Sequence, residues 1–221
     1  MQMQTDKGLR QAHHTMPARQ NIYVAGEPSD NVVVICEGWA ARVMRLSDGR
    51  RQILSYLLPG DIVSTDSLFR DSHNYYVQSL TTVRYSKIKR SDVFERLKHG
   101  DALLELFGGM ICSEKDEADE LLADVGQRVA EERIARLILR LIRRLAARGL
   151  VSDRTVSFPL RQQHIADTVG LTAVHVSRII SALRKQEVVD ISRGSLQVID
   201  PARFLSLAGF RARDWNSLLA D

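Results

Sequence analysis

Residues 21–100 alternate between short apolar runs and turn signals, a pattern that is typical of β-strands. The apolar runs are rich in β-branched and aromatic residues, and they read NVVVICEGWAARVMRL, RRQILSYLL and YYVQSLTTVRYSKI. Several short strands at regular spacing predict a small antiparallel barrel or sandwich. Residues 1–20 are polar and show no such pattern, so we expect them to form a flexible lead-in.

Between residues 101 and 126 the apolar positions follow the period of a helix. They recur at spacings of three and four, with Glu114 as the one polar member of the repeat, at Leu104, Phe107, Ile111, Ala118, Leu121 and Val125. Such a heptad seam is typical of a helix that pairs with a second copy in a coiled coil. An amphipathic helix buried in its own domain would also fit, and Leu103, Leu106 and Met110 form a second stripe that suits it. We predict a dimerisation helix over 101–126.

Residues 127–221 form the third predicted domain and differ in charge from the rest. From residue 126 onward the chain has 16 Lys and Arg against 9 Asp and Glu, a net charge of +7, whereas residues 1–125 carry −3. The domain opens with an Arg-rich amphipathic helix, RVAEERIARLILRLIRRLAARG, which Gly149 is expected to end. A basic region on a slightly acidic chain indicates a polyanionic partner for this part alone.

The segment QQHIADTVGLTAVHVSRIIS, residues 162–181, has the spacing of a helix-turn-helix. Gly170 stands where the turn needs a positive φ, Ala166 lets two helices approach closely, and Thr172 can cap the second helix. Five apolar residues fall on the faces that form a shared core: Ile165, Val169, Leu171, Val176 and Ile179. The outward positions near the start of the second helix enter the major groove in this motif, and here they are Val174, His175, Ser177 and Arg178.

A hairpin signature follows in VVDISRGSLQVI, where two apolar runs flank Arg193-Gly194. A hairpin in this place is the wing of a winged helix, and Asp200-Pro201 then opens a final helix. We predict that Arg178 donates two hydrogen bonds to a guanine and that Val174 contacts a thymine methyl, with Ser177 reaching a base or a phosphate. Four residues are predicted to position phosphates: Arg161, Gln163, Thr172 and Arg193.

The chain resembles the Crp/Fnr superfamily of bacterial transcription regulators, in its Fnr/FixK-like branch. The resemblance rests on three segments: GWAARVMRLSDGRRQILSYLLPGD, AEERIARLILRLIRRLAARG and Gly170–Arg178. The resemblance extends from about residue 21 to the end. It implies an α+β fold with an N-terminal antiparallel β-roll of the cyclic-nucleotide-binding type, a long dimerisation helix and a C-terminal winged helix-turn-helix. It also implies a homodimer that binds a palindromic promoter site and contacts RNA polymerase.

The chain departs from the family pattern where family members hold their effectors. Cyclic-AMP-binding members have a Gly-Glu pair and an Arg-Ser pair in the roll, where this chain has Ser64-Thr65 and His73-Asn74. These four residues mark a candidate effector pocket, but without the arginine we do not expect cyclic AMP to bind. No cysteine precedes Cys36, so an iron–sulfur cluster is not expected either. A haem stays open as an alternative, because His13, His14, His73, His99 and Cys36 are potential axial ligands.

Two departures fall in the DNA-binding part. Val174 stands where the family usually has a glutamate that accepts a hydrogen bond from cytosine, so the preference for the neighbouring base is expected to change. Arg161 replaces a Ser/Thr cap, so the first helix of the motif is expected to lose a cap and gain a phosphate contact.

Composition narrows the class of protein. The 221 residues are 44% hydrophobic and 26% charged, as in globular proteins, and no apolar run is long enough for a membrane span. Two distant cysteines, Cys36 and Cys112, fit no metal spacing and suit a reducing cytoplasm.

The sequence contains no nucleophile–base pair and no phosphate-binding loop, so nothing in it suggests an enzyme. The alternative to a DNA-binding regulator is a haem- or small-molecule-sensing module whose basic part docks another partner, and it predicts no steeply salt-dependent DNA binding.

Overall fold

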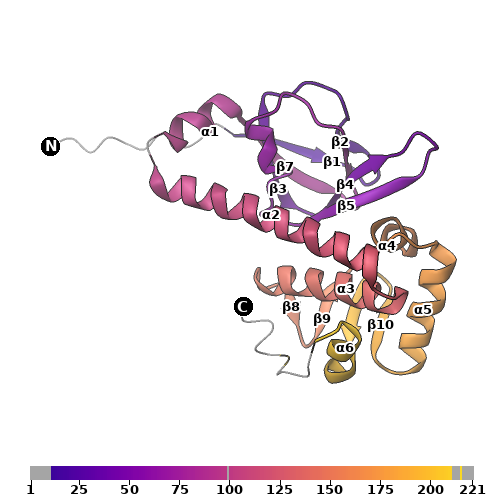
Figure 1. The fold of residues 1–221 in the computed structure, drawn as a ribbon. Coiled ribbons are helices and arrows are strands. Elements are labelled where there is room, and N and C mark those ends of the chain that lie inside the picture. Colours follow the sequence, from indigo (N-terminus) through magenta and orange to yellow (C-terminus); the bar gives the residue numbers. More distant parts are fainter. Residues whose placement is uncertain (1–10, 99, 211–214, 216–221) are drawn as a thin grey trace. The chain divides into compact units, whose positions relative to one another are not determined.

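The computed structural model describes residues 11–98, 100–210 and 215, and the chain forms two compact units that divide between residues 116 and 117. The N-terminal unit contains two antiparallel sheets, with strand orders β1-β7-β3 and β2-β6-β4-β5 (Figure 1). The strands are β1 (Gln11–Met16), β2 (Asn21–Tyr23), β3 (Asn31–Glu37), β4 (Ala40–Arg45), β5 (Arg51–Leu57), β6 (Tyr76–Ser79) and β7 (Val83–Lys89). A 3-10 helix, Thr65–Leu68, and the helix α1 (Arg90–Leu97) complete this unit, together with the first half of α2 (Asp101–Gln127).

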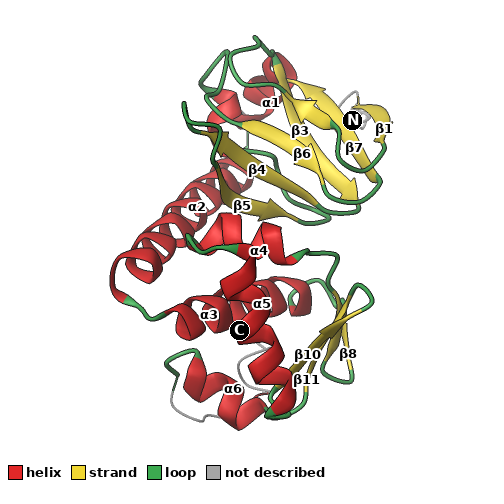
Figure 2. Cartoon of the chain, turned by 90° about the vertical axis from the view of Figure 1, so that its right-hand side faces the viewer, coloured by secondary structure: helices red, strands yellow, loops and turns green. Residues whose placement is uncertain are grey.

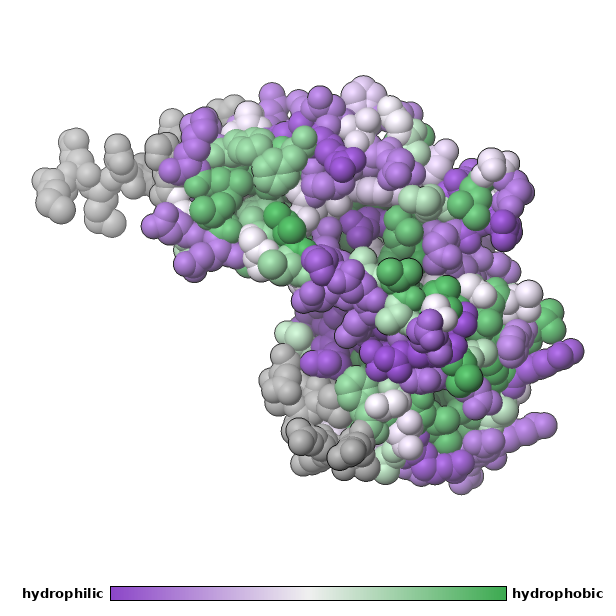
Figure 3. Space-filling view, viewed as in Figure 1, coloured by the Kyte–Doolittle hydropathy of each residue, from purple (hydrophilic) through white to green (hydrophobic). Residues whose placement is uncertain are grey.

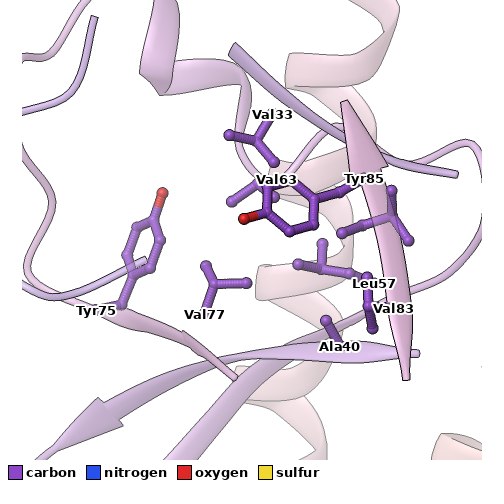
Figure 4. Close-up of a cluster of buried hydrophobic side chains, with 9 residues drawn as sticks. Val33, Ala40, Leu57, Val63, Tyr75, Val77, Val83 and Tyr85 are labelled. Atoms are coloured by element: carbon purple, nitrogen blue, oxygen red, sulfur yellow. The ribbon is translucent and has the colours of Figure 1, made fainter. Parts of the chain in front are cut away.

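The two sheets enclose one apolar core. Its buried side chains come from the inward positions of β3 to β7 and from the loops between them, and Figure 4 shows Val33, Ala40, Leu57, Val63, Tyr75, Val77, Val83 and Tyr85. The turn from β3 to β4 needs Gly38, because its φ is +81° and a Cβ there would lie 2.2 Å from the carbonyl oxygen of Thr82. The antiparallel barrel or sandwich expected from the alternating pattern is thus a two-sheet roll.

The structure corrects the expectation for residues 1–20. Within that segment Gln11–Met16 form β1, an edge strand that pairs with β7 in the register of Thr15 with Arg84 and Met16 with Val83. The sequence HHTM has little apolar alternation, so its strand conformation follows from backbone pairing with β7 rather than from its own pattern. The remaining part of the lead-in, residues 1–10, lies outside the described residues.

The C-terminal unit combines the last turns of α2 with four more helices and four short strands (Figure 2). These elements are α3 (Ala130–Ala146), β8 (Val151–Ser152), β9 (Thr155–Ser157), α4 (Gln162–Val169), α5 (Ala173–Lys185), β10 (Val189–Ser192), β11 (Ser195–Val198) and α6 (Pro201–Leu207). The hairpin predicted around Arg193-Gly194 is β10–β11, and it belongs to a four-stranded sheet of order β10-β11-β9-β8. The hairpin β8–β9 was not predicted, because strands of two and three residues carry no detectable alternation.

The helix α3 supplies the core of this unit. One face buries eight side chains, namely Ile134, Ala135, Leu137, Ile138, Leu139, Leu141, Ile142 and Leu145. The opposite face carries the predicted arginines. Three of them, Arg136, Arg140 and Arg144, form ion pairs with carboxylates of α2. The final helix begins as expected, since the side chain of Asp200 accepts from the backbone N–H of Arg203 and Pro201 occupies the first turn.

Candidate nucleic-acid interface

The helices α4 and α5 form a helix-turn-helix around Gly170. Gly170 adopts φ +69° and ends α4, as the spacing predicts. Thr172 caps α5 by accepting from the backbone N–H of His175 at 3.2 Å. Four of the five predicted core residues are buried and Leu171 is half-buried; the buried ones are Ile165, Val169, Val176 and Ile179. The motif therefore presents one face of α5 to the core and leaves the other free.

The predicted base-reading residues lie on the first two turns of α5. Val174 is 62% exposed although it is apolar, and His175 and Arg178 are exposed as well, whereas Ser177 is half-buried. Val174 and Arg178 are four residues apart and share one face of the helix. Figure 3 shows hydrophilic side chains projecting from the edge of the C-terminal unit that α5 forms. An exposed face with a guanidinium and an apolar tip suits the hydrogen-bonding groups and methyls of a major groove.

The residues predicted to contact phosphates lie at the start of α4, at the start of α5 and at the turn of the wing. Arg161 precedes α4 and is exposed, and Arg193 is exposed at the β10–β11 turn with φ +51°. The expected loss of a cap at Arg161 is offset, because Nδ1 of His164 accepts from the backbone N–H of Arg161 at 3.2 Å. The amide of Gln163 donates to Asp167 at 2.6 Å, so its side chain is held along α4.

A cavity of about 210 Å³ lies where the start of α4, the side of α5 and the wing meet. Its polar lining includes Arg161, Ser181, Arg184 and Arg193. Arg184 is occupied, since its Nε donates to Asp190 at 2.5 Å and its guanidinium also donates to the carbonyl of Ile191. The pair Arg184–Asp190 holds the wing against α5, and sequence periodicity carried no signal for it because its partners lie on different elements.

A second contact that the sequence did not reveal fixes the turn of the motif. Nε of Arg133 donates to the carbonyl of Arg128 at 2.8 Å, and its Nη1 donates to the carbonyl of Val169 at 3.3 Å. Val169 is the last residue of α4, so α3 supports the turn directly through this guanidinium. A positively charged donor at the C-terminal end of α4 also interacts favourably with the negative end of the helix dipole.

The candidate effector residues are brought together only in part. Ser64 and Thr65 are buried, and so is His73, whose ring stacks on Tyr75 with centroids 4.9 Å apart. Asp66 links them, since the Ser64 hydroxyl donates to its carboxylate and Nδ1 of His73 lies 3.3 Å from it. Asn74 is exposed in the bend that precedes β6, whereas its neighbours His73 and Tyr75 are buried, so Asn74 does not share the buried site of the other three residues.

The arginine nearest to the candidate effector residues is engaged in contacts within the chain. A buried phosphate needs a cation with free hydrogen-bond donors. The guanidinium of Arg42 is the cation that faces Ser64, and it is already bound to Ser55 at 2.8 Å, to Ser64 at 3.0 Å and to Glu114 at 3.4 Å. The side chain of Glu114 thus adds a negative charge where a phosphate would bring another.

The residues proposed as haem ligands are engaged in other contacts. Nδ1 of His13 lies 2.8 Å from the hydroxyl of Ser86, and Sγ of Cys36 lies 3.3 Å from the same hydroxyl. His14 stacks on Tyr85 with centroids 5.2 Å apart. His99 lies outside the described residues. Among the residues that the structure describes, no three His, Cys, Asp or Glu side chains form a metal-binding group.

The predicted dimer seam divides into two rows along α2. Leu104, Ile111, Ala118 and Val125 are exposed. Phe107 is only 6% exposed and packs in a cluster with Val32, Leu68, Ile88 and Val93, so its assignment to the seam is wrong. Leu121 is half-buried, whereas Leu122 is 74% exposed. The two rows lie only about 60° apart on the helix, so their spacing alone did not separate them.

Comparisons with known proteins agree with this geometry. Residues 132–207 match the model of the Crp-like helix-turn-helix domain, and residues 13–99 match that of the cyclic nucleotide-binding domain. The chain is 30% identical to the transcriptional activatory protein AadR of Rhodopseudomonas palustris, over 86% of this chain and 78% of AadR. It is 32% identical to the transcriptional activator protein FnrL of Cereibacter sphaeroides, over 89% and 80%. The solved structure of FixK2 from Bradyrhizobium japonicum superposes with a TM-score of 0.80 at 24% identity, covering 93% of this chain and all of that one.

A winged helix-turn-helix with an exposed basic helix, in a chain that also carries a cyclic-nucleotide-binding-type roll, defines a DNA-binding transcription regulator rather than an enzyme. The chain belongs to the Crp/Fnr family. None of the helices within the described residues has the length and apolarity that a membrane span requires.

Proposed function

We propose that the protein activates transcription as a homodimer that binds a palindromic promoter site. The observation that carries this proposal is the exposed face of α5, where Arg178 and Val174 stand free of the core. In a helix-turn-helix this face enters the major groove, and a two-fold dimer places two such helices about one helical turn of DNA apart. The relatives AadR and FnrL are named as activators, which supports activation, and with it a contact to RNA polymerase.

Each exposed residue has a distinct role in this proposal. Arg178 donates two hydrogen bonds to O6 and N7 of a guanine, Val174 contacts a thymine methyl, and Ser177 and His175 reach neighbouring bases. Phosphates are held by Arg161, Gln163, Thr172 and Arg193, which set the register of the protein on the duplex.

Dimerisation is proposed along the exposed stripe of α2. Its residues follow a heptad spacing and comprise Leu104, Ile111, Ala118 and Val125, with Leu122 beside them. An apolar stripe of this length costs free energy when it faces water, and a second copy of the same helix covers it by knobs-into-holes packing. No cyclic nucleotide, iron–sulfur cluster or haem is part of the proposal. Arg42 is engaged with Ser55, Ser64 and Glu114, no cysteine precedes Cys36, and His13 and Cys36 both contact the hydroxyl of Ser86.

The test is a fluorescence anisotropy titration of the protein and of the variant Arg178→Ala on specific and random duplexes at two salt concentrations. The variant should bind the specific site about 10- to 100-fold more weakly and random DNA almost unchanged. Lys185→Ala is the matched control, because Lys185 is an exposed cation in the last turn of the same helix. An equal loss on both duplexes, or a loss equal to that of the control, would show that Arg178 does not read a base.

A further inference from the structure

The cavity between the start of α4, α5 and the wing has an apolar floor. Four of its lining residues are at most 7% exposed, namely Phe158, Leu160, Ile165 and Ile180. Its rim is polar and comes from three separate segments of the chain, with Arg161 and Gln162 at the start of α4, Ser181 and Arg184 on α5, and Ser192 and Arg193 in the wing. An apolar floor beneath a few convergent polar groups is typical of a site for a small molecule.

The rim of this cavity is positively charged. Among the described residues, three guanidiniums and no acidic side chain line it. Arg184 is neutralised by Asp190, whereas neither Arg161 nor Arg193 pairs with a carboxylate in the part of the chain that the structure describes. The N–H groups in the first turn of α4 add to the positive field, because they carry the positive end of the helix dipole. Two positive charges are therefore left for an anion.

The size of the cavity limits its occupant. Its volume of about 210 Å³ lies below the roughly 300 Å³ at which sites for drug-sized ligands begin. A phosphate alone would leave the apolar floor in contact with water, whereas a single ring would cover it. A phosphate monoester carries nearly two negative charges at neutral pH, which match two guanidiniums, and a guanidinium binds phosphate oxygens by paired hydrogen bonds. The cavity therefore fits one ring that carries a phosphate.

We propose that this cavity binds a small ring-bearing phosphate ester, with the ring on the floor and the phosphate held by Arg161 and Arg193. The same two arginines hold phosphates of DNA in the proposed function, so the ester and DNA exclude each other. The ester thus regulates DNA binding from within the C-terminal unit. The competition rests on the proposed function, whereas the binding of the ester does not.

Calorimetric titration of the full chain with phenyl phosphate, in the absence of DNA, tests the site. Phenyl phosphate should bind about tenfold more tightly than inorganic phosphate, which lacks the ring, and phenol, which lacks the charge, should not bind detectably. Arg193→Ala should weaken the binding of phenyl phosphate about 10- to 100-fold, the effect of losing hydrogen bonds from a charged donor. Ser181→Leu adds apolar bulk at an exposed lining position and keeps both guanidiniums, and it should weaken the binding about tenfold because the ring no longer fits.

The matched control for Arg193→Ala is Arg154→Ala. Arg154, like Arg193, is an exposed arginine with a positive φ at the turn of a hairpin, but it does not line the cavity. This control should bind phenyl phosphate as tightly as wild type. The proposal is wrong if inorganic phosphate binds as tightly as phenyl phosphate, or if the two arginine variants lose the same affinity.

Fluorescence anisotropy of a labelled duplex tests the competition. Phenyl phosphate at concentrations that saturate the cavity should release the duplex from wild type, and sodium chloride at equal ionic strength should release less of it. On Ser181→Leu the two salts should act alike. Phenyl phosphate that fills the cavity and leaves the duplex bound would overturn the competition. A wild-type chain that binds phenyl phosphate but no duplex would contradict the proposed function while supporting the site.

Discussion

Oδ1 of Asp124 accepts a hydrogen bond from Nε of Arg136 at 2.8 Å, and the side chain of Asp124 is only 1% exposed. The same carboxylate pairs with Arg128 at 2.9 Å and with Arg140. Asp124 lies in the last turn of α2, and two of its three partners lie on α3. One buried charge thus fastens the end of the proposed dimerisation helix to the helix that supports the DNA-binding motif.

Replacing Asp124 by asparagine should destabilise the protein by about 3 kcal/mol. The substitution leaves Arg136 and Arg140 largely buried without their counter-charge, and breaking a buried pair from one side is costly. Urea denaturation measures the change. Glu120→Gln is the control, because Glu120 lies 3.5 Å from Arg140 but is 49% exposed, and it should cost at most about 0.5 kcal/mol. Equal losses in the two variants would contradict this role of Asp124.

Gly170→Ala should cost about 1 to 2 kcal/mol of stability, through backbone strain alone. The φ of +69° disfavours a side chain, whereas the nearest atom to an added Cβ is Cγ1 of Val125 at an ordinary 3.8 Å. Urea denaturation again provides the measurement. Gly109→Ala is the contrasting variant, since Gly109 lies inside α2 with open space around it, and it should be neutral or stabilising by up to about 1 kcal/mol. A neutral Gly170→Ala would show that the turn relaxes.

Val174→Glu should change the base preference without affecting the fold, because Val174 is exposed. A glutamate at this position can accept from N4 of cytosine, which a valine cannot, and the gain for the matching base pair should be about 1 to 3 kcal/mol. Anisotropy titrations against four duplexes that differ at one base pair measure the shift. Val174→Ala, which only removes methyl groups, should flatten the preference instead. If both variants keep the wild-type preference, Val174 does not face a base.

Ile111→Lys should shift the protein toward the monomer, since it places a charge in the exposed stripe of α2. Sedimentation equilibrium at micromolar concentration measures the change, and DNA affinity should fall with it because one half-site contact is lost. Leu106→Lys is the control, because Leu106 is an exposed leucine of the same helix outside the stripe. A monomeric control with a dimeric Ile111→Lys would reverse the assignment of the seam.

Asp190 should stabilise the wing at neutral pH but not in acid. Its pKa lies below the usual value, first because the Ser192 hydroxyl donates a hydrogen bond to it and then because Arg184 does, and these outweigh its burial. A group whose pKa is lower in the folded state stabilises above the unfolded pKa, and this contribution is lost as the pH falls through the folded value. Asp190→Asn should therefore be less stable than wild type at neutral pH by about 0.5 kcal/mol.

Urea denaturation along the acid limb tests this dependence, because the two curves should converge as Asp190 becomes protonated. Ser192→Ala removes one of the two donors and should move the point of convergence to higher pH. Curves that stay parallel throughout would show that Asp190 contributes through packing alone.

Local patterns in the sequence were sufficient for most of the C-terminal unit. The turn at Gly170, the cap at Thr172, the wing around Arg193-Gly194 and the start of α6 at Asp200 depend on interactions within a few residues, so the residue types at those positions determine them. The exposed face of α5 follows from the same periodicity, since the apolar positions are assigned to the core and the rest remain outside.

Other features depended on residues that are distant in the sequence. The strand β1 forms because its backbone pairs with β7. Phe107 is buried because it packs against Val32 and Ile88. The pairs Asp124–Arg136 and Arg42–Glu114 join residues on separate elements, and no periodicity within one element encodes which charge meets which. Sequence alone therefore determined the local elements and the residue types on the exposed face of α5. Tertiary structure decided which face of α2 is free and which charges are paired, because burial and ion pairing are set only when distant segments pack.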